Sequence, residues 1–198
     1  MENLFLNWGW SHTMSKLTPY LLLVILGILL MRFILKSSRI KNKIAKISVA
    51  VLLLLAPFGV YFAVNPIYQG DFSQNGKDLK IRNAKTTSID NGLLVLTIPG
   101  CPYCFESVQS LKYLKSRNPE LKIQFAVTGT DDKSYLEGYK KEVNGSFDVV
   151  LYEKARTLVS ETGGQFPTFV MIKNGKAIYS WTNDEFGVRA KDKLENWK

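Results

Sequence analysis

The sequence predicts an α/β domain with a mixed central sheet flanked by helices, preceded by two transmembrane helices. Two apolar stretches occupy the first third of the 198-residue chain. From residue 89 onward, short apolar runs typical of strands alternate with segments of helical periodicity, which is the pattern of a layered α/β fold. An Asn-Gly dipeptide between the last two strand-like runs predicts an antiparallel hairpin at the end of that sheet.

The two apolar stretches, residues 17–35 and 47–64, are each long enough to cross a bilayer. Between them, residues 36–46 carry most of the basic charge of the front segment, which is the pattern of a cytoplasmic loop. We therefore expect residues 1–16 and the domain to lie outside the cytoplasm. The expected location is the cytoplasmic (inner) membrane of a bacterium, where the two helices contact membrane lipid and the domain lies on the periplasmic or extracellular side. An outer belt of interfacial aromatic residues is expected from Trp8, Trp10, Tyr20, Tyr61 and Tyr68.

Other interpretations of the front segment are open. A cleavable signal is disfavoured because the positive charges follow the first apolar run instead of preceding it. If translation begins at Met31, residues 32–46 become the charged start of a single signal anchor, and the domain still faces outward. Transport through the helices is disfavoured because Arg32 is their only internal charge and they contain no carboxylate.

The charge distribution argues against nucleic-acid binding. Residues 1–69 contain seven Lys and Arg against one acidic residue, whereas residues 70–198 contain 19 against 16. The front segment thus supplies +6 of the net +9, and the domain lacks the strong positive charge that a nucleic-acid-binding surface needs.

Residues 65–88 are expected to form a linker with at most a short strand, because they are rich in Gly, Asn, Asp, Ser and Lys. Residues 89–198 then form the domain. Its first strand is a continuous apolar run, and the next helix has apolar residues at helical spacing until Asn118-Pro119 ends it. The expected strands are at 93–98, 121–127, 147–152, 168–172 and 177–181. The expected helices run from 102 until Asn118-Pro119, from 130–132 to about 143, over 153–162 and over about 188–196.

Cys101 and Cys104 are the two cysteines of the chain, and they lie between the first strand and the first helix of the domain. A disulfide across two residues closes a very short loop, so a stabilising role is disfavoured. A zinc site is disfavoured too, because it needs about four ligands and the only histidine, His12, precedes the first apolar run. No metal is expected, and chance spacing of the pair remains an alternative.

The position of the pair instead predicts thiol chemistry. Pro102 suits the first helical position, which makes Cys101 the N-cap. Backbone N–H groups and the helix dipole favour a thiolate there, so Cys101 is the expected nucleophile. Cys104 lies one turn further into the helix, where a more buried thiol resolves the mixed disulfide that Cys101 forms.

With these residues the chain resembles the thioredoxin superfamily over about residues 89–198. The second matching segment runs from Phe166 to Lys176 and is similar to the family's cis-proline loop, the strand after it and a tight hairpin. The resemblance implies a thioredoxin-like fold with Pro167 as a cis-proline beside Cys101 and with Phe166 pairing its backbone with an extended substrate. The Pro102-Tyr103 dipeptide resembles that of glutaredoxins.

The sequence also departs from these patterns. Gly100 stands where thioredoxins commonly have tryptophan, and Val95 where they have a buried acid, so proton transfer to Cys104 has no such acid to use. The glutaredoxin-like glycine pair after the cis-proline strand is missing, which argues against a glutathione site. The stretch from Trp181 to Ala190 is similar to the ends of thioredoxin-like domains fused to DoxX-type membrane proteins. A purely structural interpretation of that stretch has Trp181 and Phe186 as packing residues, with residues 183–185 starting the last helix.

The expected function is thiol-disulfide exchange on extracytoplasmic protein thiols or disulfides, with the Cys101–Cys104 disulfide as the redox group and no further cofactor. The direction, oxidase, isomerase or reductase, is open. Because neither apolar span contains a cysteine, a reductase would need a separate membrane electron donor. The alternative is a non-catalytic accessory subunit that docks onto a membrane partner.

Overall fold

The computed structural model describes residues 2–37, 42–65, 76–79, 89–152 and 156–197. The chain divides into two compact units, Met1–Tyr68 and Gln69–Lys198, which are described separately below. Tyr68, Arg39, Lys41 and most of the expected linker lie outside the described residues.

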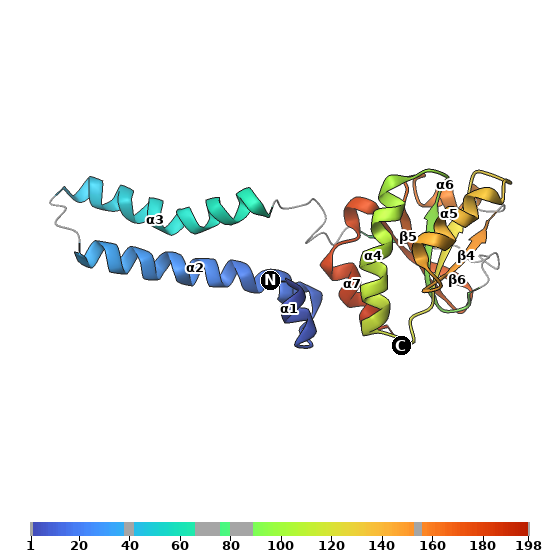
Figure 1. The fold of residues 1–198 in the computed structure, drawn as a ribbon, viewed down its shortest axis with the longest axis horizontal. Coiled ribbons are helices and arrows are strands. Elements are labelled where there is room, and N and C mark those ends of the chain that lie inside the picture. The colour runs from blue at the N-terminus through green and yellow to red at the C-terminus, as the bar shows by residue number, and fades with distance from the viewer. Residues whose placement is uncertain (1, 38–41, 66–75, 80–88, 153–155, 198) are drawn as a thin grey trace. The chain divides into compact units, whose positions relative to one another are not determined.

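The first unit consists of three helices: α1 (Glu2–Asn7), α2 (His12–Ser37) and α3 (Lys43–Val64). Helices α2 and α3 run side by side in opposite directions (Figure 1). Both are long and apolar enough to cross a membrane. Both helices extend beyond the apolar runs into the flanking polar residues. Asn42 is the N-cap of α3, and its side chain accepts a hydrogen bond from the N–H of Ile44 at 2.9 Å.

Close packing joins the two long helices. A Cβ atom added to Gly27 of α2 would lie 2.8 Å from the carbonyl oxygen of Leu54 in α3, so a side chain at residue 27 would collide with the α3 backbone. Towards the start of α2 and the end of α3, the ring of Tyr20 lies 5.9 Å from that of Tyr61. These two members of the expected aromatic belt therefore lie together.

The second unit contains one mixed sheet with the strand order β1-β6-β5-β2-β3-β4. Strands β2, β3 and β4 are parallel, while β5 is antiparallel to β2 and β6 antiparallel to β5. The two-residue β1 pairs with β6 at the edge. The strands are β1 (Lys77–Asp78), β2 (Gly92–Thr97), β3 (Ile123–Val127), β4 (Asp148–Leu151), β5 (Thr168–Lys173) and β6 (Lys176–Thr182).

Helices cover both faces of this sheet (Figure 1). On one face, Leu93 and Val95 of β2 pack with residues of α4, α5 and α7. On the other face, Leu94 and Leu96 pack with residues of α6. The central strand is buried along its whole length, which explains its uninterrupted apolar sequence. The helices are α4 (Pro102–Arg117), α5 (Ser134–Val143), α6 (Arg156–Glu161) and α7 (Val188–Glu195).

The expected order of strands and helices in the domain is confirmed, with shifts at the ends of elements. Asn174 and Gly175 both have positive φ, 51° and 68°, as the predicted type I′ hairpin requires. Helix α5 starts at Ser134, and the N–H of Ser134 donates a hydrogen bond to the Asp132 side chain. Residues 183–185 form a separate 3₁₀ turn rather than the first turn of α7.

Trp181 and Phe186 are buried in the core, which confirms the packing interpretation of these residues. The parallel strands around β2, the antiparallel β5–β6 hairpin and the helices on both faces together form a thioredoxin-like fold.

Candidate active site

The cysteine motif lies where β2 ends and α4 begins. Cys101 is the N-cap of α4, with extended backbone angles (φ −78°, ψ 108°), and Pro102 is the first helical residue. Proline suits this position because its missing N–H would have no partner in the helix. Cys101 therefore stands immediately before the first turn of α4.

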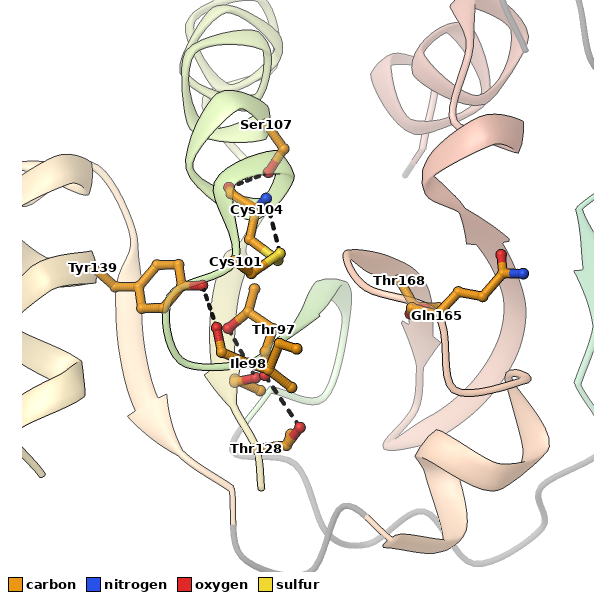
Figure 2. Close-up of a disulfide and its surroundings, with 10 residues drawn as sticks. Thr97, Ile98, Cys101, Cys104, Ser107, Thr128, Tyr139, Gln165 and Thr168 are labelled. Atoms are coloured by element: carbon orange, nitrogen blue, oxygen red, sulfur yellow. Dashed lines mark hydrogen bonds between the residues drawn. A yellow bond between two sulfur atoms is a disulfide. The ribbon is translucent and has the colours of Figure 1, made fainter. Parts of the chain in front are cut away.

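Cys101 and Cys104 form a disulfide with their Cα atoms 5.3 Å apart (Figure 2). The backbone N–H of Cys104 donates a hydrogen bond to the Sγ atom of Cys101 at 3.2 Å. Cys101 is 7% exposed and Cys104 is fully buried. The outer sulfur therefore sits at the helix N-terminus, and the inner one sits below it in the core.

Polar contacts support the residues on both sides of the pair (Figure 2). The Tyr139 hydroxyl of α5 donates to the Ile98 carbonyl at 2.8 Å. Thr128 donates to the Thr97 carbonyl through its N–H at 2.8 Å and its hydroxyl at 3.1 Å. The Ser107 hydroxyl donates to the Cys104 carbonyl at 2.7 Å. These bonds fix the end of β2 and the first turn of α4.

Burial raises the pKa of Tyr139, while a hydrogen bond with the Thr97 side chain acts in the opposite direction. The phenol therefore stays protonated at neutral pH and acts as a hydrogen-bond donor to Ile98.

The segment before β5 lies next to the end of β2. Thr168, the first residue of β5, pairs with Leu96 in the antiparallel ladder. The Phe166–Pro167 peptide bond is cis, and the Thr168 hydroxyl donates to the carbonyl of Gln165 across it. Because Leu96 is five residues before Cys101, the register brings this segment beside the strand end that leads into the cysteine motif.

A cleft of about 680 Å³ opens beside this segment. Ile98 and Phe166 contribute to its wall, and the same two side chains pack against the core cluster that contains both cysteines. Tyr152 and Val159 also line the cleft. A largely apolar concave surface of this size is in the range of binding sites.

The expected site residues thus fall on two neighbouring segments. Cys101, Pro102, Tyr103 and Cys104 lie at the start of α4, with Tyr103 59% exposed. Phe166 and Pro167 lie on the adjoining segment before β5. The buried Val95 occupies the position at which the resemblance implies an acid, so no carboxylate enters the core there.

The sequence did not reveal the contact between Tyr139 and the segment before Cys101. Tyr139 lies four residues before Val143, on the face of α5 that packs into the core, and this spacing predicts burial. Its hydrogen bond with Ile98 joins residues 41 apart, which the helical pattern does not encode.

Comparison with known proteins gives structural neighbours only. No family model matches the chain, and no curated protein matches it. Among solved structures, a secreted Mycobacterium tuberculosis disulfide oxidoreductase homologous to E. coli DsbE aligns with 18% identity and a TM-score of 0.38, covering 51% of this chain and 81% of that one.

Two further neighbours come from Bacteroides. The thioredoxin domain of a thiol-disulfide oxidoreductase from Bacteroides vulgatus has 19% identity and a TM-score of 0.42, covering 61% of this chain and 91% of that one. A thiol:disulfide interchange protein from Bacteroides sp. has 18% identity and a TM-score of 0.40, covering 61% and 84%. The fold assigned to this chain depends on its own strand order and pairing, together with the Cys-x-x-Cys disulfide at the end of β2.

Proposed function

We propose that this chain is a membrane-anchored thiol-disulfide oxidoreductase that exchanges disulfides with extracytoplasmic protein thiols through Cys101 and Cys104. The observation that carries the proposal is the position of the disulfide: Cys101 caps α4, and its Sγ accepts a hydrogen bond from the Cys104 N–H. The same N–H and the helix dipole stabilise a negative charge on this sulfur when the disulfide is reduced.

In the reducing direction, the Cys101 thiolate attacks one sulfur of a substrate disulfide. A Cys101–substrate disulfide forms, and the other substrate sulfur leaves as a thiolate. The Cys104 thiolate then attacks the Cys101 sulfur, which closes the Cys101–Cys104 disulfide and releases the second substrate thiolate. Two electrons pass to the substrate, and the reverse sequence oxidises a substrate dithiol.

An unfolded or extended polypeptide is the proposed substrate. Tyr103, which is exposed, lies within the cysteine motif, and the apolar cleft is lined by Ile98, three residues before Cys101, and by Phe166. Pro167 and the backbone of Phe166 are proposed to align the substrate chain beside Cys101. A reducing role requires a membrane electron donor, and an oxidising role requires an acceptor, because the chain has no cysteine outside the motif.

The catalytic test compares the full-length protein in detergent micelles with Cys101→Ser and Cys104→Ser in dithiothreitol-driven insulin reduction. We expect activity from the wild type and none from Cys101→Ser. In a separate incubation with insulin, after the dithiothreitol has been removed, pre-reduced Cys104→Ser should form a stable mixed disulfide on Cys101. Equal inactivity of wild type and Cys101→Ser, with no mixed disulfide in Cys104→Ser, would support the accessory-subunit alternative. The reduction potential of the pair then gives the direction, since related pairs span roughly −270 to −120 mV.

The anchoring part of the proposal has its own test. Replacing Lys41, Lys43 and Lys46 by neutral residues removes basic charge between the two apolar runs, residues 17–35 and 47–64. The change should mix the two orientations in bacterial inner-membrane vesicles. Protease protection of the domain reports the orientation. An unchanged protection pattern would contradict the proposed topology.

A further inference from the structure

Tyr139 contacts the chain on both sides of the disulfide, although it belongs to a different helix. Its hydroxyl donates to the Ile98 carbonyl, three residues before Cys101, at 2.8 Å. Its ring stacks on Phe105, the residue after Cys104, with 4.5 Å between ring centroids and planes 11° apart. Figure 2 shows the hydroxyl reaching the backbone just before the cysteine motif.

The position of Tyr139 is itself well fixed. The side chain is 1% exposed, and its ring also lies 6.1 Å from that of Phe125 in the central sheet. Helix α5 is therefore anchored to the sheet through the same residue that contacts the cysteine motif. A rigid residue of this kind holds neighbouring backbone in place at little further cost in conformational entropy.

We propose that Tyr139 is a positioning residue that holds Cys101 and Cys104 close together when their disulfide is open, and so favours ring closure. This inference rests on the proposed function, because it concerns the resolving step of the same cysteine pair. Tyr139 acts through Ile98 and Phe105, and no contact with either sulfur is involved.

The physical basis is effective concentration. When the disulfide is reduced, its covalent link disappears, and the separation of the sulfurs depends on the backbone before Cys101 and after Cys104. Tyr139 restrains both segments, one by a hydrogen bond and the other by ring stacking. Restraint in a near-reactive geometry raises the equilibrium constant and the rate of an intramolecular attack.

The reaction used for the test is the exchange of the Cys101–Cys104 disulfide with two molecules of glutathione, which gives the dithiol and glutathione disulfide. The full-length protein in detergent micelles is equilibrated with glutathione buffers of known composition, and its oxidised fraction is measured by alkylation and mass spectrometry. Tyr139→Phe keeps the ring and removes the hydroxyl. The matched control is Tyr135→Phe on the same helix, where the tyrosine is 45% exposed.

Tyr139→Phe should lower the equilibrium constant for disulfide formation about fivefold, the scale of one net hydrogen bond. This change corresponds to a reduction potential about 20 mV less negative, since tenfold is about 30 mV for two electrons. Tyr135→Phe should leave the constant unchanged. Phe105→Leu, which removes the stacking and keeps the Tyr139 hydroxyl, should shift it in the same direction.

A merely structural role would give a different result. If Tyr139→Phe lowers the melting temperature while its equilibrium constant equals that of the wild type, the proposal is overturned. If Tyr139→Phe fails to fold, as judged by circular dichroism, an unshifted constant in Phe105→Leu overturns it instead. The glutathione equilibrium needs no protein substrate, so a shift in an otherwise inactive protein would support Tyr139 positioning while contradicting the proposed function.

Discussion

The Sγ atom of Cys101 accepts a hydrogen bond from the backbone N–H of Cys104 at 3.2 Å, inside a loop that their disulfide closes. One sulfur therefore lies at the N-terminus of α4, while the other is fully buried beneath it. This difference between two chemically identical side chains leads to the first prediction.

In the reduced protein, Cys101 should react with iodoacetamide at least about tenfold faster than Cys104. The helix N-terminus favours the thiolate of Cys101, and burial keeps the reagent away from Cys104. Mass spectrometry of Cys101→Ser and Cys104→Ser, each with one remaining thiol, measures the two rates separately. Equal rates at pH 6 would contradict the assigned roles of attacking and resolving cysteine.

Introducing an acid at residue 95 should destabilise the domain in a pH-dependent way. Val95 is fully buried and pairs with Phe125 and Phe169 in the sheet. Desolvation raises the pKa of a carboxyl in such a place, so Val95→Asp should fold best at acid pH and lose stability as pH rises through the folded-state pKa. We expect a loss of about 3 kcal/mol or more at pH 8.

Chemical denaturation at pH 4 and pH 8 measures this difference, with Val95→Asn as the uncharged control. The asparagine variant should lose a similar amount of stability at both pH values. A pH-independent loss in Val95→Asp would show that the new carboxyl reaches water.

The start of α5 should respond to pH in the opposite sense. Asp132 accepts a hydrogen bond from the Ser134 N–H at 2.8 Å, and this bond lowers the pKa of the exposed carboxyl from 3.8. A lowered folded-state pKa gives stability that is present above the unfolded-state pKa and is lost as pH falls through the folded-state value.

Asp132→Ala should therefore lower the melting temperature by a few degrees at pH 7, and the difference from wild type should shrink in acid. Thermal melts at several pH values test this, with Asp131→Ala as the neighbouring control. If both alanine variants melt alike at pH 7, the Asp132–Ser134 hydrogen bond does not stabilise the helix.

Gly27 should be needed for the packing of α2 against α3. A Cβ atom at this position would lie 2.8 Å from the Leu54 carbonyl oxygen, whereas one at Gly59 would meet nothing within 4 Å. Gly27→Ala should weaken the helix pair, because a small residue at this position lets the two helices approach closely. Gly59→Ala should have little effect.

Cysteine-free full-length protein carrying one new cysteine in each helix provides the measurement, through disulfide cross-linking in micelles. The efficiency should fall severalfold in Gly27→Ala and stay unchanged in Gly59→Ala. Similar efficiency in both variants would count against this packing.

Patterns of residues that are close together in the sequence predicted much of the site and of the fold. The Cys101 N-cap, the helix from Pro102 and the hairpin at Asn174-Gly175 each depend on residues within a few positions of one another. The short α1 and the two-residue β1 were not predicted specifically, because neither has a long periodic pattern. The bond from Tyr139 to Ile98 depends on how α5 packs against the sheet, and no local pattern reports this.

The small size of the disulfide loop also bears on how the protein is made. Cys101 and Cys104 are three positions apart, so joining them removes little freedom from an unfolded chain. The core of the domain extends far beyond this loop, from β2 to α7. Loop closure by this disulfide therefore contributes little to the stability of the domain, so the sheet can assemble whether the two cysteines are reduced or oxidised.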